Sequence, residues 1–185
     1  MKVWTIQSKE VLNTIATKGV YQPNFEMSPY LMKNPKLANL YRFILESYNS
    51  VNGMNLSALI YGFMQSDGKQ IFPIENIDEF YTFINEKMPA IKSFWNNIDK
   101  ENSVILQLEY KDNFNPLYID INDFQALMPP VMIIPPYTQN TFDTICRDIQ
   151  NGIIRTSIFP SYAIQCHLPY ISQDNIVQAY SVFDI

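Results

Sequence analysis

The spacing of apolar residues changes along the chain, and each change predicts a different element. Residues 3–6 form a short apolar run that indicates a first strand. Apolar side chains then recur at helical spacing over residues 8–19, 34–52 and 75–88, each stretch with a capping or breaking residue at an end. The segment 54–64 is apolar on most sides, which we interpret as a buried helix.

The second half of the chain has the alternating pattern that is typical of strands. Val104, Leu106 and Leu108 alternate with more polar neighbours, which predicts a half-buried strand. Further strands are expected over residues 117–121, 162–171 and 176–183, with helices from Asp123 and over residues 140–152. The order of one strand, several helices and then mostly antiparallel strands predicts the α+β class.

A short apolar segment between two proline pairs is the most unusual feature of the pattern. Pro129-Pro130 and Pro135-Pro136 bracket it, and prolines at these positions keep it out of the middle of a sheet. An exposed segment of this kind is suited to docking a partner protein. The four residues concerned are Val131, Met132, Ile133 and Ile134.

The polar side of the helix over residues 75–88 is acidic, with Glu75 and Glu79 among its residues. Such a face either contacts a basic partner or is simply solvated. We keep both interpretations and name Glu75 and Glu79 as candidate partner-binding residues.

Composition narrows the class of protein. The chain has 185 residues, 47% of them hydrophobic and 17% charged, so we expect one soluble domain over residues 1–185. No apolar run approaches the ~20 residues of a membrane span. The start lacks the apolar stretch of a secretory signal, which favours a cytoplasmic protein. With a net charge of −5 and scattered lysines and arginines, we expect no direct binding to nucleic acid.

The sequence has no recognisable catalytic, nucleotide-binding or metal-binding motif. The five glycines form neither a phosphate-binding loop nor a dinucleotide fingerprint, and the only histidine, His167, follows Cys166 directly. Neighbours in a strand point to opposite faces, so these two make a poor nucleophile–base pair. Glu109, Asp120 and Asp123 could meet as an acid pair, which alone is weak evidence. We therefore assign no catalytic residue and no metal site, and expect a non-catalytic protein.

Two short stretches offer groups that could bind a small ligand. Arg155 and Thr156 could line a phosphate-binding rim, although a strand edge with ordinary polar residues explains them equally well. Trp4 and Gln7 on the first strand could bind a planar ligand. In the alternative interpretation, Trp4 is a buried residue of the core.

The opening Val3-Trp4-Thr5-Ile6-Gln7, followed by a helix that ends at residues 19–21, resembles a bacterial domain family of unknown function. Members of that family begin with Leu-Trp-Thr-Ile-Gln. Residues 105–109, 120–124 and 164–166 are also similar to it. The chain departs from the family in its middle, which lacks the usual tryptophans.

The layout also resembles the split-sheet fold of ADP-ribosyltransferases. That likeness implies that Gln7 lies in a nicotinamide cleft and that the catalytic glutamate is absent or replaced by Tyr170. A missing acid implies binding rather than transferase activity, and a fold likeness alone does not establish function.

Two functional hypotheses follow. The first is a non-catalytic interaction protein with a protein partner and no cofactor. The chain is rich in Asn, Ile, Lys and Tyr, which is typical of proteins encoded by AT-rich genes such as those of phages and mobile elements. For a protein of that origin, an inhibitor of a host defence complex is a reasonable expectation. The second is a protein that binds a nicotinamide nucleotide such as NAD. The second requires Trp4, Gln7 and Arg155 to converge on one pocket, and the first requires an exposed apolar or acidic face.

Overall fold

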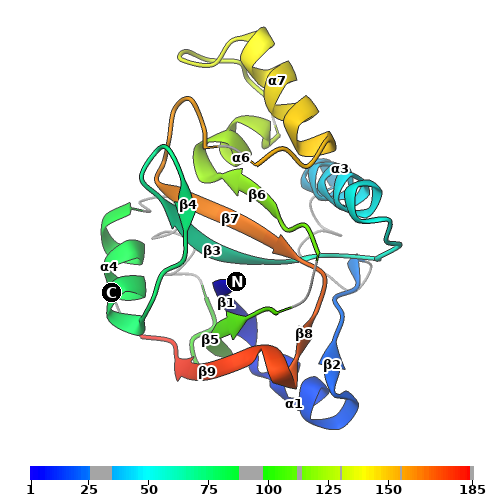
Figure 1. The fold of residues 1–185 in the computed structure, drawn as a ribbon, viewed down its shortest axis with the longest axis vertical. Coiled ribbons are helices and arrows are strands. Elements are labelled where there is room, and N and C mark those ends of the chain that lie inside the picture. The colour runs from blue at the N-terminus through cyan, green and yellow to red at the C-terminus, as the bar shows by residue number, and fades with distance from the viewer. Residues whose placement is uncertain (26–34, 88–97, 112–113, 130, 155, 184–185) are drawn as a thin grey trace.

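The computed structural model describes residues 1–25, 35–87, 98–111, 114–129, 131–154 and 156–183 (Figure 1). Its centre is a seven-stranded sheet in the order β6-β7-β3-β1-β5-β9, with β4 paired to β3. All of the pairings are antiparallel. The strands are β1 (Lys2–Ser8), β3 (Ile60–Ser66), β4 (Ile71–Phe72), β5 (Ser103–Glu109), β6 (Leu117–Asp120), β7 (Ala163–Leu168) and β9 (Ile176–Ser181).

Helices surround this sheet, and a small second sheet joins β2 (Val20–Tyr21) to β8 (Ile171–Ser172). The predicted α+β class with antiparallel strands is confirmed. In Figure 1, α6 and α7 lie at one end of the long axis beyond the edge strand β6, and α1 lies toward the other end. The helices are α1 (Lys9–Lys18), α3 (Pro35–Asn52), α4 (Ile77–Lys87), α6 (Ile121–Leu127) and α7 (Gln139–Gln150).

The first helix begins and ends where the sequence predicts. The Ser8 side chain accepts a hydrogen bond from the backbone N–H of Glu10 at 3.2 Å, which caps the first turn. Gly19 has φ 78° and donates its N–H to the Ile15 carbonyl at 2.7 Å. This left-handed backbone conformation favours glycine, because residues with a Cβ atom meet a steric penalty in it.

The prediction of a helix over residues 54–64 is wrong, because most of its second half belongs to strand β3. This strand lies between β1 and β7 and is buried on both faces, so its sequence is apolar without alternation. At Gly62, a Cβ would lie 2.6 Å from the Trp4 carbonyl oxygen, so only glycine fits here.

Strand β5 is present as predicted, but it is not half-buried. Its five central residues are all buried, including Ile105 and Gln107, because β5 has strands on both sides and helices cover both faces of the sheet. The Gln107 side chain is satisfied by a hydrogen bond from Nε2 to the Glu75 carbonyl at 2.9 Å. A buried polar side chain with a partner costs little, which is why the strand tolerates it.

The core consists of three apolar clusters that share the sheet. One face packs Val3 and Leu106 against Ile15 of α1. The other face packs Trp4 against Phe80 of α4, with ring centroids 4.9 Å apart. The third cluster joins α3, α6 and α7 to β6. None of the helices within the described ranges is both long enough and apolar enough to cross a membrane.

Candidate functional site

The apolar segment between the proline pairs is exposed. Residues 131–134 have no regular secondary structure, and each exposes between 40% and 65% of its surface. Pro135 and Pro136 are also exposed. Four consecutive large aliphatic side chains in water are costly, so this segment is a candidate contact surface.

A second exposed aliphatic segment follows α7. Ile153, Ile154 and Ile158 each expose between 47% and 60% of their surface. These isoleucines come after the helix has ended at Asn151, so they have no helical face to bury. This segment was not predicted from the sequence, although the β-branched residues that follow the helix-ending Gly152 were a usable signal.

A ring contact and a shared carboxylate join the two segments. The Tyr137 ring lies 5.2 Å from the Phe159 ring in an edge-on arrangement. Asp123 Oδ1 accepts a hydrogen bond from the Tyr137 hydroxyl at 3.1 Å and another from the Ser157 hydroxyl at 2.6 Å. We therefore treat residues 131–137 and 153–159 as one surface, the apolar double loop, of which residue 155 lies outside the described part.

The N-terminal turn of α6 anchors the second segment at further points. Asp120 caps α6 through the Asn122 N–H at 2.9 Å and also accepts the Ser161 N–H at 3.1 Å. Asn122 donates its side-chain amide to the Phe159 carbonyl at 2.9 Å. Burial raises the pKa of Asp120, and its hydrogen bonds oppose that rise.

The carboxylates at this turn correspond only in part to the predicted acid pair. Asp120 and Asp123 are neighbours, and the charge of Asp123 contributes to the raised pKa of Asp120. Glu109 does not join them, because three strands lie between β5 and β6. Asp123 accepts hydrogen bonds from the Tyr137 and Ser157 hydroxyls of the double loop, whereas Asp120 accepts the backbone N–H groups of Asn122 and Ser161. These contacts give both carboxylates a structural role.

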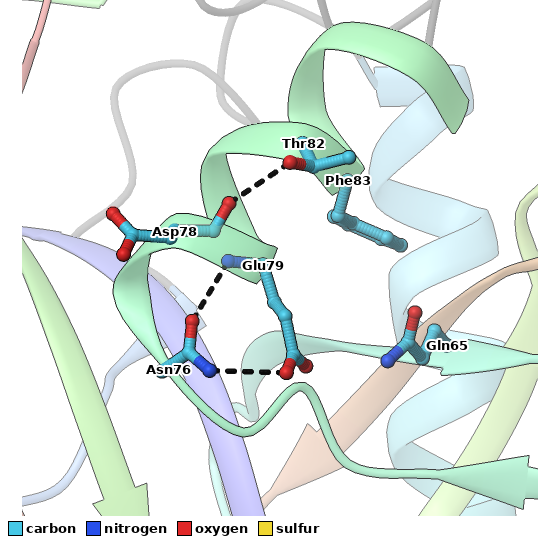
Figure 2. Close-up of a pocket in the computed structure, with 6 residues that line it drawn as sticks. All are labelled: Gln65, Asn76, Asp78, Glu79, Thr82 and Phe83. Carbon is cyan, nitrogen blue, oxygen red and sulfur yellow. Dashed lines mark hydrogen bonds between the residues drawn. The ribbon is translucent and has the colours of Figure 1, made fainter.

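The acidic face of α4 is exposed, but part of it stabilises the helix itself. Asn76 Oδ1 accepts the Glu79 N–H at 2.9 Å, and Asn76 Nδ2 donates to Glu79 Oε1 at 3.0 Å (Figure 2). This reciprocal arrangement caps the helix N-terminus. Glu75 forms an exposed ion pair with Lys2. A hollow of about 550 Å³ lies beside these groups and is lined by Gln65, Asn76, Asp78, Glu79, Thr82 and Phe83.

The candidate ligand-binding residues do not come together in the described part of the chain. Trp4 is fully buried and donates its indole N–H to the Ile74 carbonyl at 2.7 Å, so the core alternative holds. Gln7 points to the opposite face of β1 and donates to Thr5 Oγ1 at 2.8 Å. Thr156 donates to the Gly68 carbonyl at 2.8 Å. Gly68 follows the C-terminal end of β3, whereas Gln7 lies near the C-terminal end of β1, which runs antiparallel to β3. Arg155 lies outside the described residues.

Cys166 and His167 are both buried in β7. Burial raises the pKa of the Cys166 thiol and lowers the pKa of His167 to about 3, so both groups are neutral at pH 7. The His167 Nε2 and Gln165 Oε1 atoms are buried and have no hydrogen-bond partner within the part of the chain that the structure describes. Among the described residues, no group of three or more histidine, cysteine, aspartate and glutamate side chains could hold a metal ion.

Charge is sparse around the apolar double loop. From residue 125 to residue 142 the sequence has no charged side chain, and in the following twenty residues only Asp143, Arg147, Asp148 and Arg155 are charged. An uncharged apolar centre is typical of protein–protein interfaces. Comparisons with protein-family models, with curated proteins and with solved structures find no match for this chain, so its function has to be inferred from this site.

Proposed function

We propose that the chain is a non-catalytic interaction protein and that the apolar double loop is its docking surface for a protein partner. The observation that carries this proposal is the aliphatic run at residues 131–134, which is exposed at every position. Ile153, Ile154 and Ile158 extend the same surface through the contacts of Asp123.

The energetics favour a partner on this surface. Burying a side chain the size of Met132 or Ile134 gains about 1.5–3 kcal/mol when it starts fully exposed. Met132 is 65% exposed and Ile134 is 59% exposed, so each retains more than half of that gain for binding. Several such contacts can offset the cost of association, which is about 4–15 kcal/mol.

The loops are also held in place before binding. Ser157 and Asp123 are both buried, and their hydrogen bond fixes the second segment to α6. A preformed surface loses less conformational freedom on association than a floppy one. This supports docking as the role of the double loop.

Site-specific photo-crosslinking tests this proposal. A benzoylphenylalanine is placed at Met132 in one variant and at Val177 in a control, because Val177 is an aliphatic residue on β9 of comparable exposure, 55% against 65%. Irradiation in cells that naturally produce the protein should give one defined crosslinked product from position 132. The product should disappear when Ile154 is also replaced by aspartate. Equal crosslinking from both positions would refute the proposal.

The other expectations from the sequence stay predictions. No contact among the described residues favours a nicotinamide nucleotide, and an origin in a phage or mobile element is not tested by any structural observation. The likeness to ADP-ribosyltransferases and to the bacterial family is likewise untested. A partner recovered by crosslinking would identify the biological setting directly.

A further inference from the structure

Sulfur atoms are the groups of this chain that a mild oxidant such as a peroxide attacks first. We propose that Met132 is the first of the described sulfur side chains to be oxidised, and that its sulfoxide weakens docking by the apolar double loop. The second part rests on the proposed function, because it concerns the same surface. The described sulfur side chains are those of Met1, Met54, Met64, Met128, Met132, Cys146 and Cys166.

Exposure favours Met132 as the site of oxidation. It exposes 65% of its surface, the largest fraction among the large apolar residues that the structure describes. Met54 exposes 37%, and Met64 in β3 exposes only 5%. Residues 131–134 have no regular secondary structure, so neither a helix nor a strand shields the Met132 thioether from an oxidant.

The two partly buried methionines are less available. Met1 Sδ accepts a hydrogen bond from the Tyr118 hydroxyl at 3.0 Å, which engages a lone pair that would otherwise attack the oxidant. Met128 follows α6 directly and packs against the third apolar cluster. We therefore expect both thioethers to react more slowly than that of Met132.

The two cysteines do not compete with Met132 at neutral pH. A cysteine reacts with peroxide as the thiolate, whereas a methionine reacts without losing a proton. Burial raises the pKa of Cys146 and of Cys166, and the charge of Asp143 adds to the rise at Cys146. Both groups are therefore mainly neutral thiols at pH 7, and Cys166 is also fully buried.

The oxidation needs only a peroxide as its second reactant. A sulfur lone pair of Met132 attacks one peroxide oxygen, and the S–O bond forms as the O–O bond breaks. The departing hydroxide takes up the remaining proton and leaves as water, so sulfur loses two electrons and the peroxide gains them. The sulfoxide oxygen is polar, and burying it in an apolar contact without a donor is costly. Sulfoxide reductases restore the thioether, which makes the change reversible.

Peptide mapping of the purified full chain tests the site of oxidation. The protein is exposed to hydrogen peroxide at pH 7 for a series of times. We expect Met132 to gain oxygen at least about tenfold faster than Met64, in line with their exposed fractions of 65% and 5%. In urea the rates of the described methionines should converge, because unfolding exposes every thioether. Oxidation of another described sulfur before Met132, or an order that persists in urea, would overturn the inference and leave the proposed function standing.

Photo-crosslinking tests the effect of oxidation on docking. Benzoylphenylalanine is placed at Ile158, an exposed residue of the double loop. The protein is oxidised, catalase removes the peroxide, and an extract of cells that naturally produce the protein is then added. Oxidation should lower the yield of crosslinked product at least about fivefold, the effect of one polar group left without a partner. The same probe in a Met132→Leu chain should keep its yield, because leucine preserves the aliphatic contact and cannot be oxidised.

Two crosslinking results would overturn the effect on docking. One is a yield that oxidation of Met132 leaves unchanged, and the other is an equal loss of product in the Met132→Leu chain. If position 158 gives no product even before oxidation, the proposed function is contradicted and the effect on docking falls with it, whereas the mapped site of oxidation stands. Circular dichroism before and after oxidation verifies that the fold is intact.

Discussion

The Ser157 hydroxyl donates a hydrogen bond to Asp123 Oδ1 at 2.6 Å, although 34 residues separate them in the chain. Both side chains are almost fully buried. The bond fixes the segment after α7 to the first turn of α6, while the Tyr137 hydroxyl fixes the segment before α7 to the same oxygen. One carboxylate therefore links the two halves of the apolar double loop, together with the contact between the Tyr137 and Phe159 rings.

Removing this carboxylate should destabilise the protein. We expect Asp123→Ala to lower the free energy of unfolding by about 3 kcal/mol, because buried hydroxyl groups lose a charged acceptor. Tyr137→Phe removes a single hydrogen bond and should cost only about 1 kcal/mol. Urea denaturation of the two variants measures both values. A loss below about 0.5 kcal/mol for Asp123→Ala would show that the carboxylate does not hold the loops.

Gly62 should be intolerant of any side chain. In Gly62→Ala, the new Cβ would collide with Val3 Cγ1 and with the Trp4 carbonyl oxygen, which belongs to the backbone and cannot rotate away. We expect a loss of about 3 kcal/mol or more in the free energy of unfolding. The control is Gly53→Ala, whose Cβ meets no atom within 4 Å and pays only for its φ of 61°. That control should cost about 1 kcal/mol. Equal losses in the two variants, measured by thermal melting, would contradict the steric argument.

The boundaries of α1 were predictable because local side chains set them. Ser8 caps the first turn and Gly19 takes the left-handed conformation that ends the helix, and both effects act within a few residues. Strand β3 was not predictable in the same way. Its apolar pattern results from strands on both sides and packing on both faces, and these neighbours come from distant parts of the chain.

The proposed docking surface was predictable only in its first half. Two proline pairs keep residues 131–134 out of the middle of a sheet, so covalent geometry predicts their irregular backbone, and the structure shows that their side chains are exposed. The contribution of Ile153, Ile154 and Ile158 depends on Asp123 reaching Tyr137 and Ser157, which are long-range tertiary contacts. The place of Trp4 was not predictable, because a tryptophan on a strand fits both a ligand site and a core. Its place in the core depends on the Ile74 carbonyl, which accepts the indole hydrogen bond and lies 70 residues away in the chain.

His167 should make stability depend on pH in the acid range. Burial lowers its folded pKa to about 3, below the unfolded value of 6.5, so the unfolded chain takes up a proton first. The stabilising effect is complete above pH 6.5 and is lost as the pH falls toward 3. Between pH 7 and pH 4 we expect a loss of about 3 kcal/mol from this group. The slope of the unfolding free energy against pH reflects how many protons the chain takes up on unfolding. In His167→Gln that number should fall by about one. Identical slopes for the variant and the wild type, measured by urea denaturation at several pH values, would contradict a neutral buried histidine.

The nicotinamide-nucleotide hypothesis makes a separate prediction that a thermal shift measurement can decide. A ligand that binds only the folded state at 100 times its dissociation constant stabilises that state by about 2.7 kcal/mol. Because Trp4 and Gln7 lie on opposite faces of β1 and Thr156 bonds to the Gly68 carbonyl, we expect NAD to leave the melting temperature unchanged. Lys2→Ala serves as the comparison for non-specific ionic effects, since Lys2 is an exposed cation on the same strand. A saturable rise in melting temperature that Gln7→Ala abolishes and Lys2→Ala preserves would establish a nucleotide site and count against a purely protein-binding role.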